Sequence, residues 1–94
     1  MIVRQVKLTF HSFHVEEFLN LFHSIEEKIK TFPGCQKLEL YQDINNKNIF
    51  FTYSIWNSEA DLELYRHSPL FQSVWKKTKT FFSIPAEAWS LKTV

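Results

Sequence analysis

The chain has 94 residues, with 11 basic and 10 acidic side chains mixed along it and a formal net charge of +1. Because no basic stripe forms, we do not expect nucleic acid as a partner. A single cysteine, Cys35, excludes an internal disulfide and a metal site built from cysteines. No signal peptide or membrane-spanning apolar run is recognisable, so the sequence predicts a cytoplasmic protein without a membrane partner.

The first third of the chain predicts a strand followed by a long helix. Residues 2–10 alternate between the two faces of a strand. Further on, apolar residues recur every three or four positions, as on one face of a helix: Val15, Phe18, Phe22, Ile25, Ile29 and Phe32. We expect Ser12 or His14 to cap this helix. Pro33 and Gly34, the only glycine, should end it, with Gly34 in a left-handed conformation.

The middle of the chain predicts a hairpin. Residues 37–43 alternate as in a strand, and the asparagine-rich residues 45–48 favour a turn. Residues 49–56 are apolar on both faces, which is typical of a strand that is covered on both sides.

Two caps divide the remaining helical segment. Ser58 with Asp61 resembles a capping box, and Ser68 followed by Pro69 predicts a second helix start. We expect this second helix to include Phe82 and to close at Pro85, and residues 89–94 to form the last strand.

The resulting order is strand, helix, strand, strand, helix pair, strand, without a linker. It predicts a single domain over residues 1–94 of the α+β class, with the ferredoxin-like βαββαβ antiparallel sheet and its helices on one face. The other face also needs cover, because residues 49–56 are apolar on both sides. Dimerisation of two copies through their sheet faces would supply that cover.

The segments "FPGCQKLELYQD" and "IFFTYSIWNSEADLELYRHSPLF", within this element order, resemble the antibiotic biosynthesis monooxygenase family. The resemblance implies a homodimeric α/β-barrel with a pocket between sheet and helices in each subunit. Several members oxidise phenols or quinols with molecular oxygen and without metal or flavin, whereas others degrade haem. At the positions that the haem-degrading relatives use, this chain has Val6, Tyr65 and Trp75. Without a histidine there the iron would lack its axial ligand, so we do not expect haem degradation.

By its place in such a pocket, Tyr65 could orient a phenolic substrate, and His67 could shuttle protons. These two are the predicted catalytic residues. The predicted substrate-binding residues are Trp56, Trp75, Phe22 and Phe71. The alternatives are structural: Tyr65 with its hydroxyl in water, His67 in an exposed loop, and tryptophans that only pack the core.

The sequence identifies no metal site and no cofactor. His11 and His14 lack a third ligand, and a chain with one glycine cannot build a phosphate-binding glycine loop. Three functions therefore stay open. One is a cofactor-independent monooxygenase acting on a small aromatic phenol or quinol. The second is a non-catalytic dimeric barrel that binds a small apolar molecule or serves a regulatory role. The third is haem binding with altered ligands.

Overall fold

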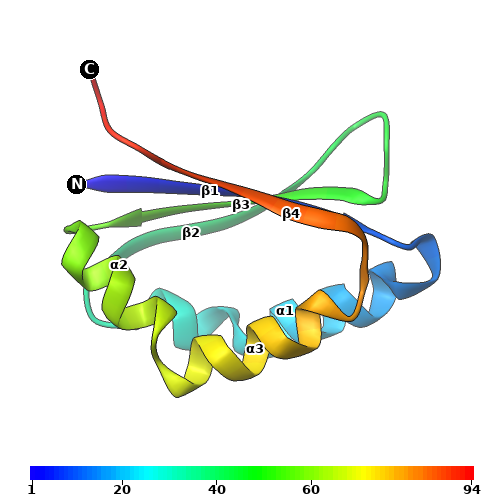
Figure 1. The fold of residues 1–94 in the computed structure, drawn as a ribbon, viewed down its shortest axis with the longest axis horizontal. Helices are drawn as coiled ribbons and strands as arrows, with labels where there is room; N and C mark the ends of the chain where they lie inside the picture. The colour runs from blue at the N-terminus through cyan, green and yellow to red at the C-terminus, as the bar shows by residue number, and fades with distance from the viewer.

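The computed structural model describes residues 1–94 and shows one antiparallel sheet with every helix on the same face (Figure 1). The strands are β1 (Ile2–Phe10), β2 (Cys35–Gln42), β3 (Ile49–Trp56) and β4 (Phe82–Leu91). The helices are α1 (Val15–Lys30), α2 (Glu59–Arg66) and α3 (Pro69–Lys79), with a short 3-10 turn η1 (Ser12–His14) before α1. The strand order β2-β3-β1-β4 confirms the predicted α+β ferredoxin-like fold.

The predicted helix boundaries are confirmed at Gly34, Ser58 and Ser68. Gly34 has φ 89°, the left-handed conformation expected beyond a helix end. The hydroxyl groups of Ser58 and Ser68 accept hydrogen bonds from the backbone N–H groups of Asp61 and Phe71. The start of α1 differs from the prediction, because η1 leads directly into it and no side chain caps it.

The last strand begins earlier than predicted. Helix α3 ends at Lys79, and β4 already starts at Phe82 and runs through Pro85. Proline is tolerated here because β4 is an edge strand, and because the register with β1 shifts between Lys7 and Thr9, next to Pro85. A proline at such a bulge removes no regular hydrogen bond from the sheet.

The core lies between the sheet and the helices. Phe10 on β1 is almost fully buried, and its ring lies 4.3 Å from that of Phe18 on α1 and 5.8 Å from that of Phe50 on β3. Phe22 and Ile29 continue the buried face of α1, as its apolar period predicted.

The opposite face of the sheet has no helix over it (Figure 1). Alternate residues of β3 point there, and they are half-buried rather than buried: Ile49, Phe51, Tyr53 and Ile55. Neighbouring β1 and β4 add Val3, Trp89 and Leu91 to the same face. Val3 pairs with Ile55 on one side and with Leu91 on the other, and Trp89 pairs with Gln5, which lies opposite Tyr53. The uncovered face is therefore rich in apolar side chains, as the two-faced pattern of residues 49–56 predicted.

None of the helices combines the length and the apolar character needed to cross a membrane.

Candidate functional site

A cavity of about 270 Å³ lies between the sheet and the helices. Of the 20 residues that line it, 15 are hydrophobic. The space exists because β4, after Phe82 at its start, contributes only small side chains to this part of the sheet, namely Ala86 and Ala88, with Ala88 paired to Val6. The central strands fill the equivalent layer with Leu8 and Phe50, which are buried.

One wall of the cavity is a continuous series of aromatic rings. Trp56 at the end of β3 stacks on Tyr65 of α2, with ring centres 4.8 Å apart and planes inclined by 24°. Phe71 of α3 meets Tyr65 edge-on at 5.2 Å and stacks on Trp75 at 5.7 Å. The tight turn at Ser68 lets α2 and α3 present these rings to one side, and such geometries are favourable for aromatic pairs.

The structure thus brings five of the six predicted site residues to one cavity: Trp56, Tyr65, Phe71 and Trp75, with Phe22 added from α1. Trp56 is only 1% exposed, and its indole Nε1 donates a hydrogen bond of 3.0 Å to the hydroxyl oxygen of Ser54. Trp56 is therefore a fixed wall, whereas Trp75 on α3 is only half-buried.

Tyr65 is a neutral phenol in this setting. Burial, and then the nearby thiol of Cys35, raise the pKa of Tyr65 well above its ordinary value of 10.0. Its hydroxyl has no hydrogen-bond partner among the protein groups, although its ring is held by Trp56 and Phe71. Tyr65 therefore cannot act as a general base near neutral pH, and its contribution is a ring surface and a protonated hydroxyl.

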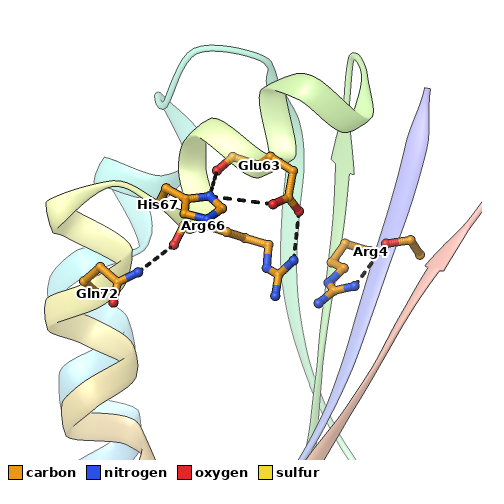
Figure 2. A network of polar contacts seen from close by, with 6 residues as sticks. Arg4, Glu63, Arg66, His67 and Gln72 are labelled. Atoms are coloured by element: carbon orange, nitrogen blue, oxygen red, sulfur yellow. Dashed lines mark hydrogen bonds and ion pairs between the residues drawn. The ribbon is translucent and has the colours of Figure 1, made fainter.

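His67, the other predicted catalytic residue, does not line the cavity. It follows the last residue of α2, and its side chain is 75% exposed. The ring Nδ1 lies 2.8 Å from the backbone carbonyl oxygen of Glu63 and 3.6 Å from the Glu63 carboxylate (Figure 2). The hydrogen bond to Glu63 holds the ring against the outer turn of its own helix, away from the aromatic wall.

The sequence did not predict the two charged residues of the cavity lining, namely Arg4 on β1 and Arg66 at the end of α2. Figure 2 shows both guanidinium groups reaching toward the space between α2 and the sheet. Arg4 Nη1 donates to the Ser90 hydroxyl at 3.0 Å, and Arg66 Nη1 is 2.8 Å from a carboxylate oxygen of Glu63. Partial burial and then the charge of Arg66 lower the pKa of Arg4, while Glu63 opposes this change.

A signal for Arg4 was present in the sequence. Ile2, Val6, Leu8 and Phe10 define the helix-facing side of β1, and Arg4 falls on the same side because side chains alternate along a strand. A charged residue at an inward position of an apolar series is the pattern that marks a polar site. Arg66 gave no such signal, because whether its side chain faces the cavity depends on how α2 is oriented over the sheet.

The remaining polar lining consists of hydroxyl groups: Thr52, Ser54 and Thr78. No histidine, aspartate or glutamate lines the cavity. No group of three or more potential metal ligands occurs anywhere in the molecule. His14 instead pairs with Glu17 at 2.8 Å, and Cys35 is a free thiol whose pKa is raised by burial. The chemistry of the site therefore depends on aromatic surface, hydroxyl groups and two guanidinium groups.

The family model described as antibiotic biosynthesis monooxygenase matches residues 1–77, most of the chain. The chain belongs to the antibiotic biosynthesis monooxygenase family. The match includes β1, the helices α1 and α2 and most of α3, and with them the aromatic wall and both cavity arginines. No curated protein matches the sequence.

Several solved structures share the fold of this chain. One described as an antibiotic biosynthesis monooxygenase superposes with a TM-score of 0.94 at 16% identity, covering 100% of this chain and 99% of the other. A conserved protein from Methanosarcina mazei Go1 gives 0.93 at 23% identity, covering 100% and 94%. Rv0793 from Mycobacterium tuberculosis gives 0.91 at 13% identity, covering 99% and 94%. At these identities the likeness establishes a shared fold.

Proposed function

We propose that this member of the antibiotic biosynthesis monooxygenase family is a cofactor-independent monooxygenase that oxidises a small aromatic phenol or quinol. The observation that carries the proposal is the cavity itself, about 270 Å³ of space with a wall of stacked aromatic rings. Planar aromatic ligands bind favourably between such rings. A mostly apolar cavity with a few placed polar groups is also the usual form of a small-molecule site.

The cavity volume restricts the size of the substrate. Sites for drug-sized ligands span roughly 300–1,000 Å³, so a volume of about 270 Å³ suits a molecule of one or two rings. Trp56 is fixed by its hydrogen bond to Ser54, so the cavity cannot deepen on that side without breaking a buried contact. A larger ligand would have to displace the half-buried rings of Phe71 and Trp75 or extend past the edge of β4.

The reaction needs no external reductant. A phenol and one O₂ give a quinone and one water: one oxygen atom becomes the new carbonyl and the other leaves as water. All four electrons for oxygen reduction come from the ring, which loses a C–H hydrogen and the phenolic hydrogen. In this scheme the protein excludes water, holds the ring in a reactive orientation and stabilises the electron-rich anion that reacts with oxygen. Tyr65 and Trp75 would hold the two faces of the substrate ring.

We also propose that the protein is a homodimer that buries the uncovered sheet face, as the family resemblance implies. The apolar side chains of β3 on that face, Phe51, Tyr53 and Ile55, are only half-buried in the single chain. A face-to-face pairing of two sheets would remove them from water and contribute hydrophobic stabilisation of roughly 25 cal/mol per Å² buried. The free thiol of Cys35 suits a reducing compartment, so a cytoplasmic location stays part of the proposal.

Oxygen uptake with a panel of one- and two-ring phenols and quinols tests the proposal, with no metal or flavin added. Turnover should fall at least several-fold in Ala88→Leu, because the larger side chain enters the cavity from β4. Ala60→Leu makes the same chemical change on exposed α2, outside the cavity, and should leave turnover unchanged. His67→Ala is a second control, since that ring lies outside the cavity. Absence of uptake with every compound, in a folded protein that binds them, would refute the monooxygenase proposal.

A second function is favoured by one specific observation, the absence of a general base from the cavity lining. A dimeric barrel that binds a small aromatic molecule without converting it would need no such base. Ligand-induced thermal stabilisation without product would support this function, because a ligand that binds only the folded state raises its stability. The same ligand panel therefore separates the two functions in a single set of samples.

A further inference from the structure

The two arginines of the cavity indicate what kind of ligand it accepts. Arg4 has no carboxylate within ion-pair distance: its one side-chain partner is the hydroxyl of Ser90, at 3.0 Å. Arg66 shares the carboxylate of Glu63, a pair that is 42% and 49% exposed. The two guanidinium groups and the one carboxylate together leave a net positive charge at this end of the cavity.

This arrangement is unfavourable for the empty protein. A guanidinium cannot release its proton at ordinary pH, so Arg4 stays charged although it is partly buried and close to a second cation. Placing like charges together at a partly desolvated site costs free energy, and a nearby anion offsets this cost. Glu63 offsets part of it, but its contact is with Arg66 and not with Arg4.

The guanidinium groups are also well placed for an oxyanion attached to an aromatic ring. Both belong to the residues that line the same apolar cavity as Trp56, Tyr65 and Phe71. An aromatic body in contact with these rings could direct an oxygen group toward Arg4 and Arg66. Guanidinium groups donate paired hydrogen bonds that match the geometry of oxyanions.

We infer that the cavity takes its aromatic ligand as an anion, with the anionic oxygen group bound between Arg4 and Arg66. The inference rests on the proposed function for the identity of the reacting ring, and it adds the charge state of the substrate. It also accounts for a missing component of the site. No cavity residue can remove a phenolic proton, so the substrate would lose this proton to bulk water before it enters, and the two cations would stabilise the ionised form in the cavity.

Two probes separate the possible sources of the negative charge. 2-Naphthoate carries a permanent carboxylate at neutral pH, and 2-naphthamide is its neutral counterpart of similar shape. 4-Nitrophenol is a phenol whose ionised form absorbs at a longer wavelength, so its protonation state is visible when it is bound. Binding is followed by calorimetry and, for 4-nitrophenol, by absorbance across its titration.

The native protein should bind 2-naphthoate at least tenfold more tightly than 2-naphthamide, because hydrogen bonds to charged groups are worth roughly tenfold to a hundredfold in affinity. Arg4→Gln and Arg66→Gln should each weaken 2-naphthoate binding by about tenfold or more and leave 2-naphthamide unchanged. Lys28→Gln removes the same charge from α1 outside the cavity, and should change neither affinity. Bound 4-nitrophenol should ionise at lower pH than the free phenol, and Arg4→Gln should abolish this difference.

Glu63→Gln gives a test in the opposite direction. It releases Arg66 from its exposed ion pair, so 2-naphthoate should bind a few-fold more tightly, in line with the small strength of such pairs. If Arg4→Gln does not fold, Arg66→Gln and Glu63→Gln still decide the question, because both of these side chains lie at the surface and are nearly half exposed.

Equal affinities for 2-naphthoate and 2-naphthamide in the native protein, or equal losses in the lysine control, would overturn the inference. Its failure is distinguishable from failure of the proposed function. Selective anion binding without oxygen uptake would leave the ligand class standing and remove the monooxygenase. Turnover of neutral quinols that is unaffected by Arg4→Gln would leave the monooxygenase standing and remove the anionic ligand class.

Discussion

Gly34 offers a quantitative test of how α2 is held over the cavity. The residue ends the α1–β2 connection with φ 89°, and a Cβ added there would lie 2.5 Å from Cβ and 2.6 Å from Cγ of Asp61. Asp61 is in the first turn of α2, where its backbone N–H donates to Ser58 Oγ and its carboxylate accepts from the same hydroxyl. Gly34→Ala therefore imposes both a left-handed alanine and a displacement of the α2 cap.

The two effects have separate magnitudes. The left-handed conformation costs an alanine about 1–2 kcal/mol. Loss of the Ser58 cap costs about 1 kcal/mol more. We expect Gly34→Ala to lower the free energy of unfolding by about 2–3 kcal/mol, which for a domain of this size is a decrease in Tm of at least roughly 8 °C. Chemical denaturation followed by tryptophan fluorescence measures it.

A second background isolates the steric part. Asp61→Gly removes the three atoms nearest to the new Cβ, so Gly34→Ala made in that background should cost mainly the left-handed part, about 1–2 kcal/mol. Gly34→Asn supplies the converse control, because asparagine tolerates a left-handed backbone but still carries a Cβ. A cost below about 0.5 kcal/mol for Gly34→Ala, or identical costs in the two backgrounds, would refute this account of the contact.

Three further measurements test other parts of the structure. Only the folded state holds the Tyr65 proton above pH 10, so the free energy of unfolding should fall as pH rises beyond 10. Denaturation at pH 9 and pH 11 should show a smaller fall for Tyr65→Phe than for the native protein. Ser54→Ala leaves the buried indole N–H of Trp56 without an acceptor and should cost about 1–3 kcal/mol in urea denaturation, whereas the exposed Ser83→Ala should be near neutral; equal costs would contradict the role given to this bond. Phe51→Glu on the uncovered sheet face should shift sedimentation from a dimer toward the 11.3 kDa monomer, whereas Leu64→Glu on exposed α2 should remain dimeric. A native protein that sediments as a monomer would remove the dimer proposal.

The fold was predictable because local signals agreed with one another. The helical period of α1, the single glycine after it and the two serine caps each fixed a boundary that the structure reproduces. The prediction was wrong where a local signal was read without its tertiary setting. Pro85 follows an apolar helical pattern and locally predicts a helix stop, but an edge strand with a bulge accommodates it, and only the pairing with β1 reveals that setting.

The aromatic part of the site was also predictable, because large rings near helix starts and strand ends meet on the same side of a small fold. The cavity itself was not, since a void depends on what the opposing strand leaves out. In this chain the void lies beside the small side chains Ala86 and Ala88 on β4. Only the pairing of β4 with β1 shows that these two residues face the cavity. His67 shows the converse, because its neighbours in sequence favoured the site while its hydrogen bond to Glu63 directs it outward.

Arg4 shows most directly how a sequence can indicate function through an exception to its own pattern. All the remaining residues on the helix-facing side of β1 are apolar, and packing alone would favour an apolar residue at this position as well. A guanidinium there loses hydration and gains only the Ser90 hydroxyl in return. A stabilising core would replace it with leucine, so the presence of arginine implies an interaction that the single chain does not contain. An anionic ligand in the adjoining cavity supplies that interaction.

Arg4→Leu should therefore give a protein that is at least as stable as the native one and that no longer prefers 2-naphthoate to 2-naphthamide. Destabilisation of Arg4→Leu with the preference intact would show instead that Arg4 serves the fold.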